Sequence, residues 1–251
     1  MSSRLGQKLI AEAQLVRNEL RIERAIKRAL AVHKRHALSA LDKQTLTAAA
    51  PPDAFSVDSW DQTVNTEVNG EIHAVLLGLA ATTLSALNVD ATTRATVMAQ
   101  LDIVTENSIF SGEVRRFGRQ VAEQVNEALT TGMAYGETTG QLKSRLETVF
   151  ARAGRKAATI ARDQTHGAAE KTKYTAASLT GEVEKEWLTM HDRIVRPSHQ
   201  DADGQTVLVN EPFQVGDSEL MYPRDDSGSI EEIANCRCQA RFQRAGLQSE
   251  P

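Results

Sequence analysis

The chain has 251 residues, is 41% hydrophobic and only 4% aromatic, and carries a formal net charge of −4. This length allows one large domain or two ordinary ones, with a core that needs no disulfide staples. No apolar run reaches about 18 residues and charges interrupt the amino-terminal segment, so we expect no membrane-spanning helix and no signal peptide. The two cysteines stand one residue apart, a poor spacing for a disulfide, which favours a reducing, cytoplasmic setting.

The first 45 residues form a basic segment of an otherwise acidic chain. They hold ten Lys and Arg against four Asp and Glu, a balance of about +6. Apolar residues recur at three- and four-residue steps from Leu5 to Leu30 and predict one long helix over residues 3–41. We expect this arm to meet an acidic or polyanionic partner, or to be a solvated helix face.

The next segments predict a helical body. Pro51 and Pro52 end the first helix, and Asp90 is a candidate N-cap further on. The expected helices cover residues 57–87, a short stretch after Asp90, 112–132, 140–150 and 153–178, the last one opened after Gly154.

From Val183 the apolar period shortens to two, which predicts a strand. Short extended pieces at 205–209, 218–221 and 237–242 follow, separated by turn-forming residues. The predicted fold class is therefore α+β, with long N-terminal helices and a helical body followed by a small C-terminal β-rich module. The expected domains are a basic helical arm at 1–50, a helical body at 57–180 and a small α+β module at 181–245.

The residues Cys236 and Cys238 of "NCRC" are the first candidates for chemistry. In a strand they would point to the same face, and together with His199 and one of Asp192, His191 or Asp201 they supply four potential zinc ligands. A zinc ribbon would show two such pairs, however, and cysteine is also a common buried hydrophobe. The residues leave both interpretations open, a metal site and a set of packed thiols.

The sequence predicts no enzyme and no organic cofactor. Cys236 and His199 form a nucleophile and base on paper, but nothing in the sequence supplies an oxyanion hole. Phosphate-binding glycine loops are absent, and most carboxylates of the module lie in turns. Arg193 and Arg196 are expected to clamp carbonyls or carboxylates, and "DADGQ" to form a tight turn with Gly204 at positive φ.

The order of "WLTMHDRIVRPSH", "DGQ", "YPRD" and "NCRC" resembles the phage head morphogenesis domain of phage Mu F-like minor head proteins. The upstream "GMAYGETTGQLKSRLETVF" is similar to the helical part of that family, so the resemblance covers about residues 110–242. The residues that carry the signature are Trp187, Asp192, Arg193, Arg196, His199, Gly204, Pro223, Asn235, Cys236 and Cys238.

The resemblance implies a minor capsid protein of a tailed phage or prophage, associated with the portal vertex and aiding head assembly or DNA packaging and delivery. It implies the portal protein, other head proteins and packaged double-stranded DNA as partners. The expected location is the virion, in the capsid interior or at the portal vertex, and the host cytoplasm during assembly. The alternative is a zinc-binding nucleic-acid module. The candidate portal or DNA contacts on the arm are Arg17, Arg21, Arg24, Lys27, Arg28, Lys34 and Arg35.

Overall fold

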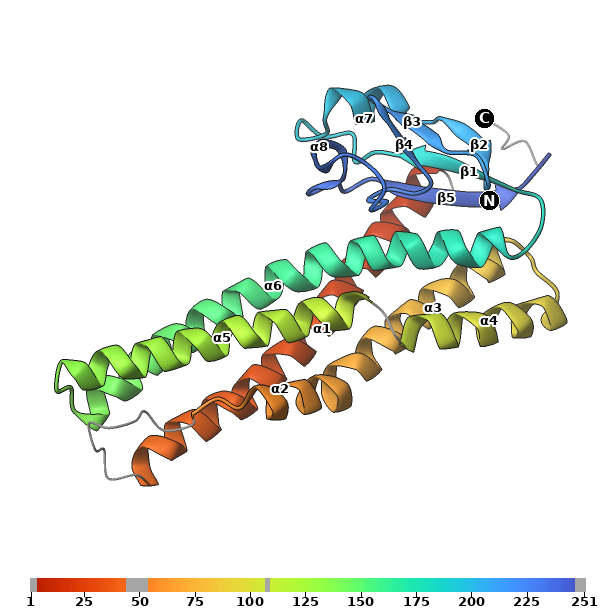
Figure 1. The fold of residues 1–251 in the computed structure, drawn as a ribbon. Helices are drawn as coiled ribbons and strands as arrows, with labels where there is room; N and C mark the ends of the chain where they lie inside the picture. The colour runs from red at the N-terminus through yellow and green to blue at the C-terminus, as the bar shows by residue number, and fades with distance from the viewer. Residues whose placement is uncertain (1–3, 44–53, 107–108, 247–251) are drawn as a thin grey trace. The chain divides into compact units, whose positions relative to one another are not determined.

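The computed structural model describes residues 4–43, 54–106 and 109–246 and confirms the predicted α+β class (Figure 1). In chain order the elements are α1 (Arg4–Lys43), α2 (Val57–Thr63), the π-helical segment η1 (Val64–Val68), α3 (Asn69–Ala86), α4 (Ala91–Glu106), α5 (Ile109–Ala134), α6 (Thr139–Ser178), β1 (Val183–Leu188), α7 (Pro197–Ala202), β2 (Thr206–Leu208), β3 (Phe213–Val215), β4 (Ser218–Leu220), α8 (Ile230–Ile233) and β5 (Gln239–Arg244). None of the described helices is long and apolar enough to cross a membrane.

The chain forms two compact units. The first comprises Met1–Ile72 and Ser108–Arg162, and the second comprises His73–Asn107 and Asp163–Pro251. The first unit is built from helices. The second unit combines helical segments with all five described strands.

Helix α1 confirms the long helix predicted for residues 3–41. Its buried residues recur at three- and four-residue steps and form one stripe, as burial of a single helix face requires. The stripe consists of Ile22, Ala25, Ile26, Ala29, Leu30, His33, Ala37 and Leu41. Over residues 12–42 of α1, whose burial is described, this stripe thus consists of small and aliphatic side chains and one histidine.

Several aromatic rings of the first unit gather around Trp60, which is fully buried. Its indole Nε1 donates a hydrogen bond to the carbonyl of Val114 at 3.1 Å. The rings of His33 and Phe117 meet it edge-on, with centroids at 5.4 and 6.2 Å. This arrangement joins α1, α2 and α5 through one side chain whose polar atom is satisfied.

Helix α6 is a single helix from Thr139 to Ser178, so the predicted separation into two helices at Gly154 is wrong. A side chain at Gly154 would meet nothing within 4 Å, so the glycine marks no close approach or turn. The apolar stripe runs through it without a phase change, and burying that stripe outweighs the intrinsic cost of one glycine. The stripe consists of Leu142, Leu146, Phe150, Ala153, Ala157 and Ala161.

In the second unit Asp90 caps α4 as predicted, accepting hydrogen bonds from the backbone amides of Thr92 and Thr93, both at 3.0 Å. A three-stranded antiparallel sheet has the order β2-β1-β5, and β3 and β4 form a separate antiparallel pair. The predicted strand at 183 and the extended pieces that became β2, β4 and β5 are confirmed. Strand β3 and helices α7 and α8 were not predicted, because elements of three to six residues are too short to show a period.

Strand β1 carries a buried lysine on its core face. The Nζ of Lys185 donates to the carbonyl of Met221 at 2.7 Å and lies 4.8 Å from the ring centroid of Phe213 and 5.2 Å from that of Tyr174. Burial lowers the pKa of Lys185 to about 8. The carbonyl of Met221 and the two aromatic rings stabilise the charged form of the Lys185 side chain.

Replacing Gly118 of α5 by alanine is expected to destabilise the helical unit. The added Cβ would stand 1.9 Å from the Nε1 of Trp60 and 2.2 Å from its Cδ1, so the indole must move from its hydrogen bond. Overpacking of this kind costs about 1–3 kcal/mol of the free energy of unfolding. Denaturant unfolding measures the loss. The control is Gly112→Ala on the same helix, where the Cβ meets nothing; equal stability of the two variants would contradict this packing.

A second prediction concerns His33, whose pKa is lowered from 6.5 by burial and, less strongly, by the charge of His36. Below pH 6.5 the unfolded chain therefore binds more protons than the folded one, so stability falls as the pH drops from this value toward the lower folded-state pKa. Thermal unfolding of His33→Gln between pH 7 and 5 is expected to show a shallower loss than the wild type. In the control, His36→Gln, only the weaker contribution is lost, so most of the dependence of stability on pH should remain. If His33→Gln left this dependence unchanged, His33 would not be its source.

Candidate functional site

Helix α7 places His199 on the buried side of the second unit. Pro197 is its first residue. A backbone nitrogen at this position has no acceptor within the helix, so proline loses no hydrogen bond there. The chain then turns back to β1 through Gly204, whose φ is 81° as predicted and whose amide donates to the carbonyl of Trp187 at 2.8 Å. The histidine thus projects from a short helix that both of its ends fix in place.

Asp203 ties this helix to the end of β1. Its Oδ1 accepts hydrogen bonds from the backbone amide of Thr189 at 2.7 Å and from the hydroxyl of the same residue at 2.9 Å. Asp203 lies in the tight turn that the sequence predicted for "DADGQ", but its side chain does more than form that turn. Its carboxylate reaches fourteen residues along the chain instead of bonding to its own backbone.

A tight turn presents the two cysteines. Asn235 has a φ of 54°, in the left-handed region that asparagine tolerates better than most residues. Arg196 donates to the carbonyl of Ala234, which confirms the clamping role expected for this side chain. The amide of Cys238 then donates to the sulfur of Cys236 at 3.4 Å, so both sulfurs face the same side just before β5.

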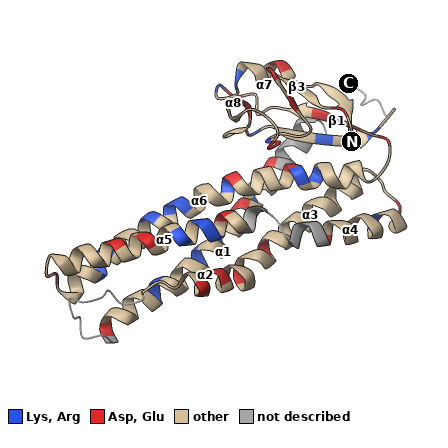
Figure 2. Ribbon diagram, in the orientation of Figure 1, with Lys and Arg blue, Asp and Glu red and all other residues tan. Residues whose placement is uncertain are grey.

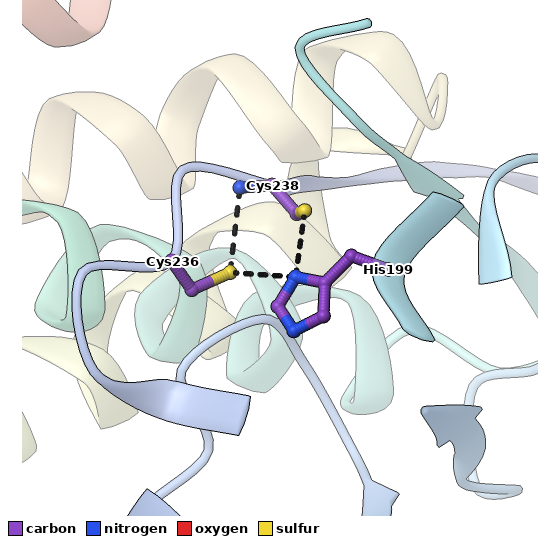
Figure 3. A group of neighbouring side chains, drawn as sticks. All are labelled: His199, Cys236 and Cys238. Atoms are coloured by element: carbon purple, nitrogen blue, oxygen red, sulfur yellow. Dashed lines mark hydrogen bonds between the residues drawn. The ribbon is translucent and has the colours of Figure 1, made fainter. Parts of the chain in front are cut away.

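The imidazole of His199 meets both sulfurs (Figure 3). Its Nδ1 lies 3.3 Å from the Sγ of Cys238 and 3.7 Å from the Sγ of Cys236. All three ligand atoms lie within 4.8 Å of one another, and all three residues are buried. We call this group the thiol–imidazole cluster.

A carboxylate fixes the other side of the same ring. The Nε2 of His199 lies 2.9 Å from Oε2 of Glu232 on α8, and the hydroxyl of Ser198 donates to that same oxygen at 2.8 Å. The hydrogen bond to Glu232 favours the tautomer with its proton on Nε2, which leaves Nδ1 directed at the sulfurs.

The two thiols of the cluster differ in the direction in which their pKa values are shifted. Hydrogen bonding from Cys238, with a further contribution from His199, lowers the pKa of Cys236 to about 5 against the opposing effect of burial. The same interaction with Cys236, together with burial, raises the pKa of Cys238. Burial alone would lower the pKa of His199, but the hydrogen bond and charge of Cys236, with Glu232, raise it. The arrangement thus favours one thiolate beside one imidazolium.

Helix α6 supports β5 from behind the cluster with two buried polar residues. The Nε2 of His166 lies 2.9 Å from the carbonyl of Cys238, and burial, with the charge of Arg224, lowers the pKa of this histidine to about 3. The carboxylate of Glu170 accepts from the amide of Ala240 at 2.9 Å, and burial raises its pKa. These contacts fix the strand that begins at the second cysteine.

A small cavity of about 20 Å³ adjoins the cluster. His199 and both cysteines line it, together with the edge residues Met190, Ile194, Val195, Arg196, Asn235 and Arg237. Such a volume holds one water molecule or one ion. A thiolate beside an imidazole is also the arrangement of a cysteine nucleophile.

The other predicted site residues lie around the cluster without joining it. Asp192, predicted as a fourth ligand, is held instead by Arg237 at 2.7 Å and by the amide of Ile194 at 2.9 Å. Trp187 is fully buried and meets the His199 ring edge-on at 5.6 Å. Arg193 is exposed, and Pro223 is buried in the turn after β4.

The predicted contacts on the arm lie on α1, in the first unit. Arg21 pairs with Glu71 at 2.7 Å, and Arg28 approaches the same carboxylate at 3.7 Å. Lys27 pairs with Glu23 of its own helix at 2.5 Å. Arg17, Arg24 and Arg35 are exposed, and Lys34 is half-buried.

Glu232 is the residue of the site that sequence reasoning missed. It stands three residues after Ser229, at the position where a glutamate usually completes a capping box. In the structure Ser229 makes no side-chain cap, and the carboxylate points to α7. The available signal therefore indicated a different role.

Replacing Asp203 by alanine is expected to lower the free energy of unfolding of the second unit by about 1–3 kcal/mol, because the buried amide and hydroxyl of Thr189 lose their acceptor. Asp201→Ala, two residues away and exposed, is the control and should change stability little. Chemical denaturation followed by far-UV circular dichroism measures both. Equal effects of the two substitutions would show that Asp203 does not hold α7.

Comparison with known proteins gives one curated relative. The chain is 27% identical over 132 residues to the NAD(+)--arginine ADP-ribosyltransferase EFV of Enterococcus faecalis, an alignment that covers 51% of this chain and 27% of that protein. The chain thus spans about a quarter of the length of this relative. No solved structure matches the chain.

The family comparison is more informative. Residues 123–241 match the family described as Phage Mu protein F like protein, from the second half of α5 to β5. The matched region contains α7, the Asn235 turn and the whole thiol–imidazole cluster. Residues 123–241 of this chain are thus a phage Mu F-like region, and this match supports a phage head morphogenesis protein.

Proposed function

We propose that this chain is a minor capsid protein that assembles at the portal vertex of a tailed phage head. There it aids head assembly and the packaging or delivery of DNA, without catalysing a reaction. The observation that carries the proposal is the family match over residues 123–241, since this family is structural.

The exposed side of α1 supports a docking role for the arm. Arg17, Arg21, Arg24, Arg28 and Arg35 follow one another at steps of four, three, four and seven residues. At about 100° per residue these five side chains fall within about 60° of one another around the helix. They therefore form one basic stripe along the helix, and Figure 2 marks the Lys and Arg positions of the described chain in blue.

The residues beside this stripe favour a protein partner over DNA alone. Val16, Leu20 and Val32 are large hydrophobic residues with 51%, 42% and 44% of their surface exposed. Apolar residues mixed with arginine are typical of protein interfaces, whereas phosphate backbones are bound mainly by charge. We therefore infer that the stripe meets an acidic, partly apolar surface of the portal protein.

The nucleic-acid alternative receives less support from the module. Of the two arginines proposed to accompany the metal ligands, Arg196 is committed to the carbonyl of Ala234, and only Arg193 projects outward. One exposed arginine makes a weak phosphate-binding surface.

The test is co-purification of the full chain with the portal protein encoded by the same phage. We expect a stable complex in which Arg17→Gln/Arg24→Gln/Arg35→Gln lowers the affinity at least tenfold, because three exposed charges of the stripe are lost. A matched control, Arg119→Gln/Arg152→Gln/Arg155→Gln, removes three exposed arginines from α5 and α6 and should retain wild-type affinity. Binding is measured by calorimetry at two salt concentrations.

Two outcomes would contradict the proposal. Portal binding that is insensitive to both salt and the α1 substitutions would exclude the stripe as the docking surface. Failure of the wild-type chain to bind portal protein, with a steeply salt-dependent affinity for double-stranded DNA that the α1 triple variant loses, would make packaged DNA the partner of the arm.

A further inference from the structure

We propose that the thiol–imidazole cluster is a zinc site in which Nδ1 of His199 and the sulfurs of Cys236 and Cys238 are the protein ligands. The fourth position would be taken by water from the adjoining cavity. This inference is independent of the portal partner, because it rests on the geometry of the second unit alone.

The separations between ligand atoms fit a tetrahedral ion. Zinc–sulfur bonds of about 2.3 Å and zinc–nitrogen bonds of about 2.0 Å place a sulfur and a nitrogen ligand about 3.5 Å apart. The two distances from Nδ1 of His199 to the sulfurs, 3.3 and 3.7 Å, lie on either side of this value. The ligands therefore stand nearly as far apart as an ion would hold them.

The surroundings of the imidazole provide a second, independent observation. A histidine that binds a metal through one ring nitrogen typically donates its other N–H to a carboxylate, which fixes the tautomer and the ring plane. Here Nε2 of His199 faces Glu232 at 2.9 Å, and Ser198 holds the same carboxylate oxygen at 2.8 Å. A histidine that served only as packing would not need this oriented carboxylate.

Nearby hydrogen-bond donors favour negative charge on the sulfurs. The backbone amide of Cys238 donates to the sulfur of Cys236 at 3.4 Å, a contact that stabilises sulfur carrying negative charge. The buried indole of Trp187 lies against the imidazole, and its Nε1 is a hydrogen-bond donor toward the sulfur of Cys238. Metal-bound thiolates would supply the negative charge that these donors favour.

The charge and the open position define the ligand class. Two thiolates and a neutral imidazole balance a divalent cation, so the buried site would carry no net charge. Sulfur and imidazole ligands select zinc over magnesium or calcium, which take oxygen ligands. Asp192 is turned to Arg237, and the remaining direction opens to a cavity of about 20 Å³, which is the size of one water molecule.

Such an ion would hold α7 to the Asn235 turn. His199 and Cys236 are 37 residues apart, so one ion would close a long loop of the second unit. We expect zinc to raise the thermal unfolding temperature of the second unit, and a chelator to reverse the rise.

The experiment uses the full, untagged chain, reduced and freed of metal, titrated with Zn²⁺ and in parallel with Co²⁺ as a spectroscopic probe. Binding of one ion per chain is expected, with a cobalt–thiolate absorption band, and Cys236→Ser and Cys238→Ser should each weaken binding at least a hundredfold. Circular dichroism of each variant reports whether it has folded.

Glu232→Gln tests the arrangement without removing a ligand. Loss of its charge should lower the zinc affinity about 10- to 100-fold while the fold is kept. The matched control is Glu231→Gln, the exposed neighbour on α8, which should bind as the wild type does. Equal affinities of the two variants would overturn the orienting role of Glu232. A reduced wild-type chain that binds no ion, or metal binding that survives loss of both cysteines, would overturn the site itself.

Discussion

The second unit depends on one contact, the imidazole of His199 set between two sulfurs and a carboxylate. Nδ1 faces Cys236 and Cys238, and Nε2 faces Glu232, so one side chain joins α7, α8 and the turn before β5. A ring with both nitrogens engaged has little freedom to rotate, and two of its partners are held in turn, Glu232 by Ser198 and Cys236 by the amide of Cys238. Movement of any of these short elements would break several polar contacts at once.

Carboxylates join separate segments of the second unit, in addition to its apolar core. Glu170 holds the amide of Ala240, Asp203 holds Thr189, and Glu232 holds His199. Each carboxylate satisfies a donor on a different segment, and the low dielectric of a buried site strengthens such contacts when they are complete. The first unit relies on the opposite means, helix stripes of small and aliphatic residues around the ring of Trp60.

The sequence predicted those features that depend on a repeating pattern. The long helix α1, the cap at Asp90 and the strand at Val183 follow from periodicity or from local chemistry. The meeting of His199 with the two cysteines was a proposal on paper, because no pattern in one sequence fixes a contact across 37 residues. The glutamate behind His199 escaped detection because its contact with α7 is made across 33 residues, and no local pattern in one sequence indicates such a contact.

The family match and the geometry describe the same segment at two levels, since residues 123–241 include every residue of the cluster. The most direct test of the cluster is X-ray absorption at the zinc edge of the zinc-loaded chain. Two sulfur neighbours at about 2.3 Å and one imidazole nitrogen at about 2.0 Å are expected if His199, Cys236 and Cys238 hold the ion. A shell of oxygen and nitrogen neighbours without sulfur would contradict it and would place the zinc on other side chains.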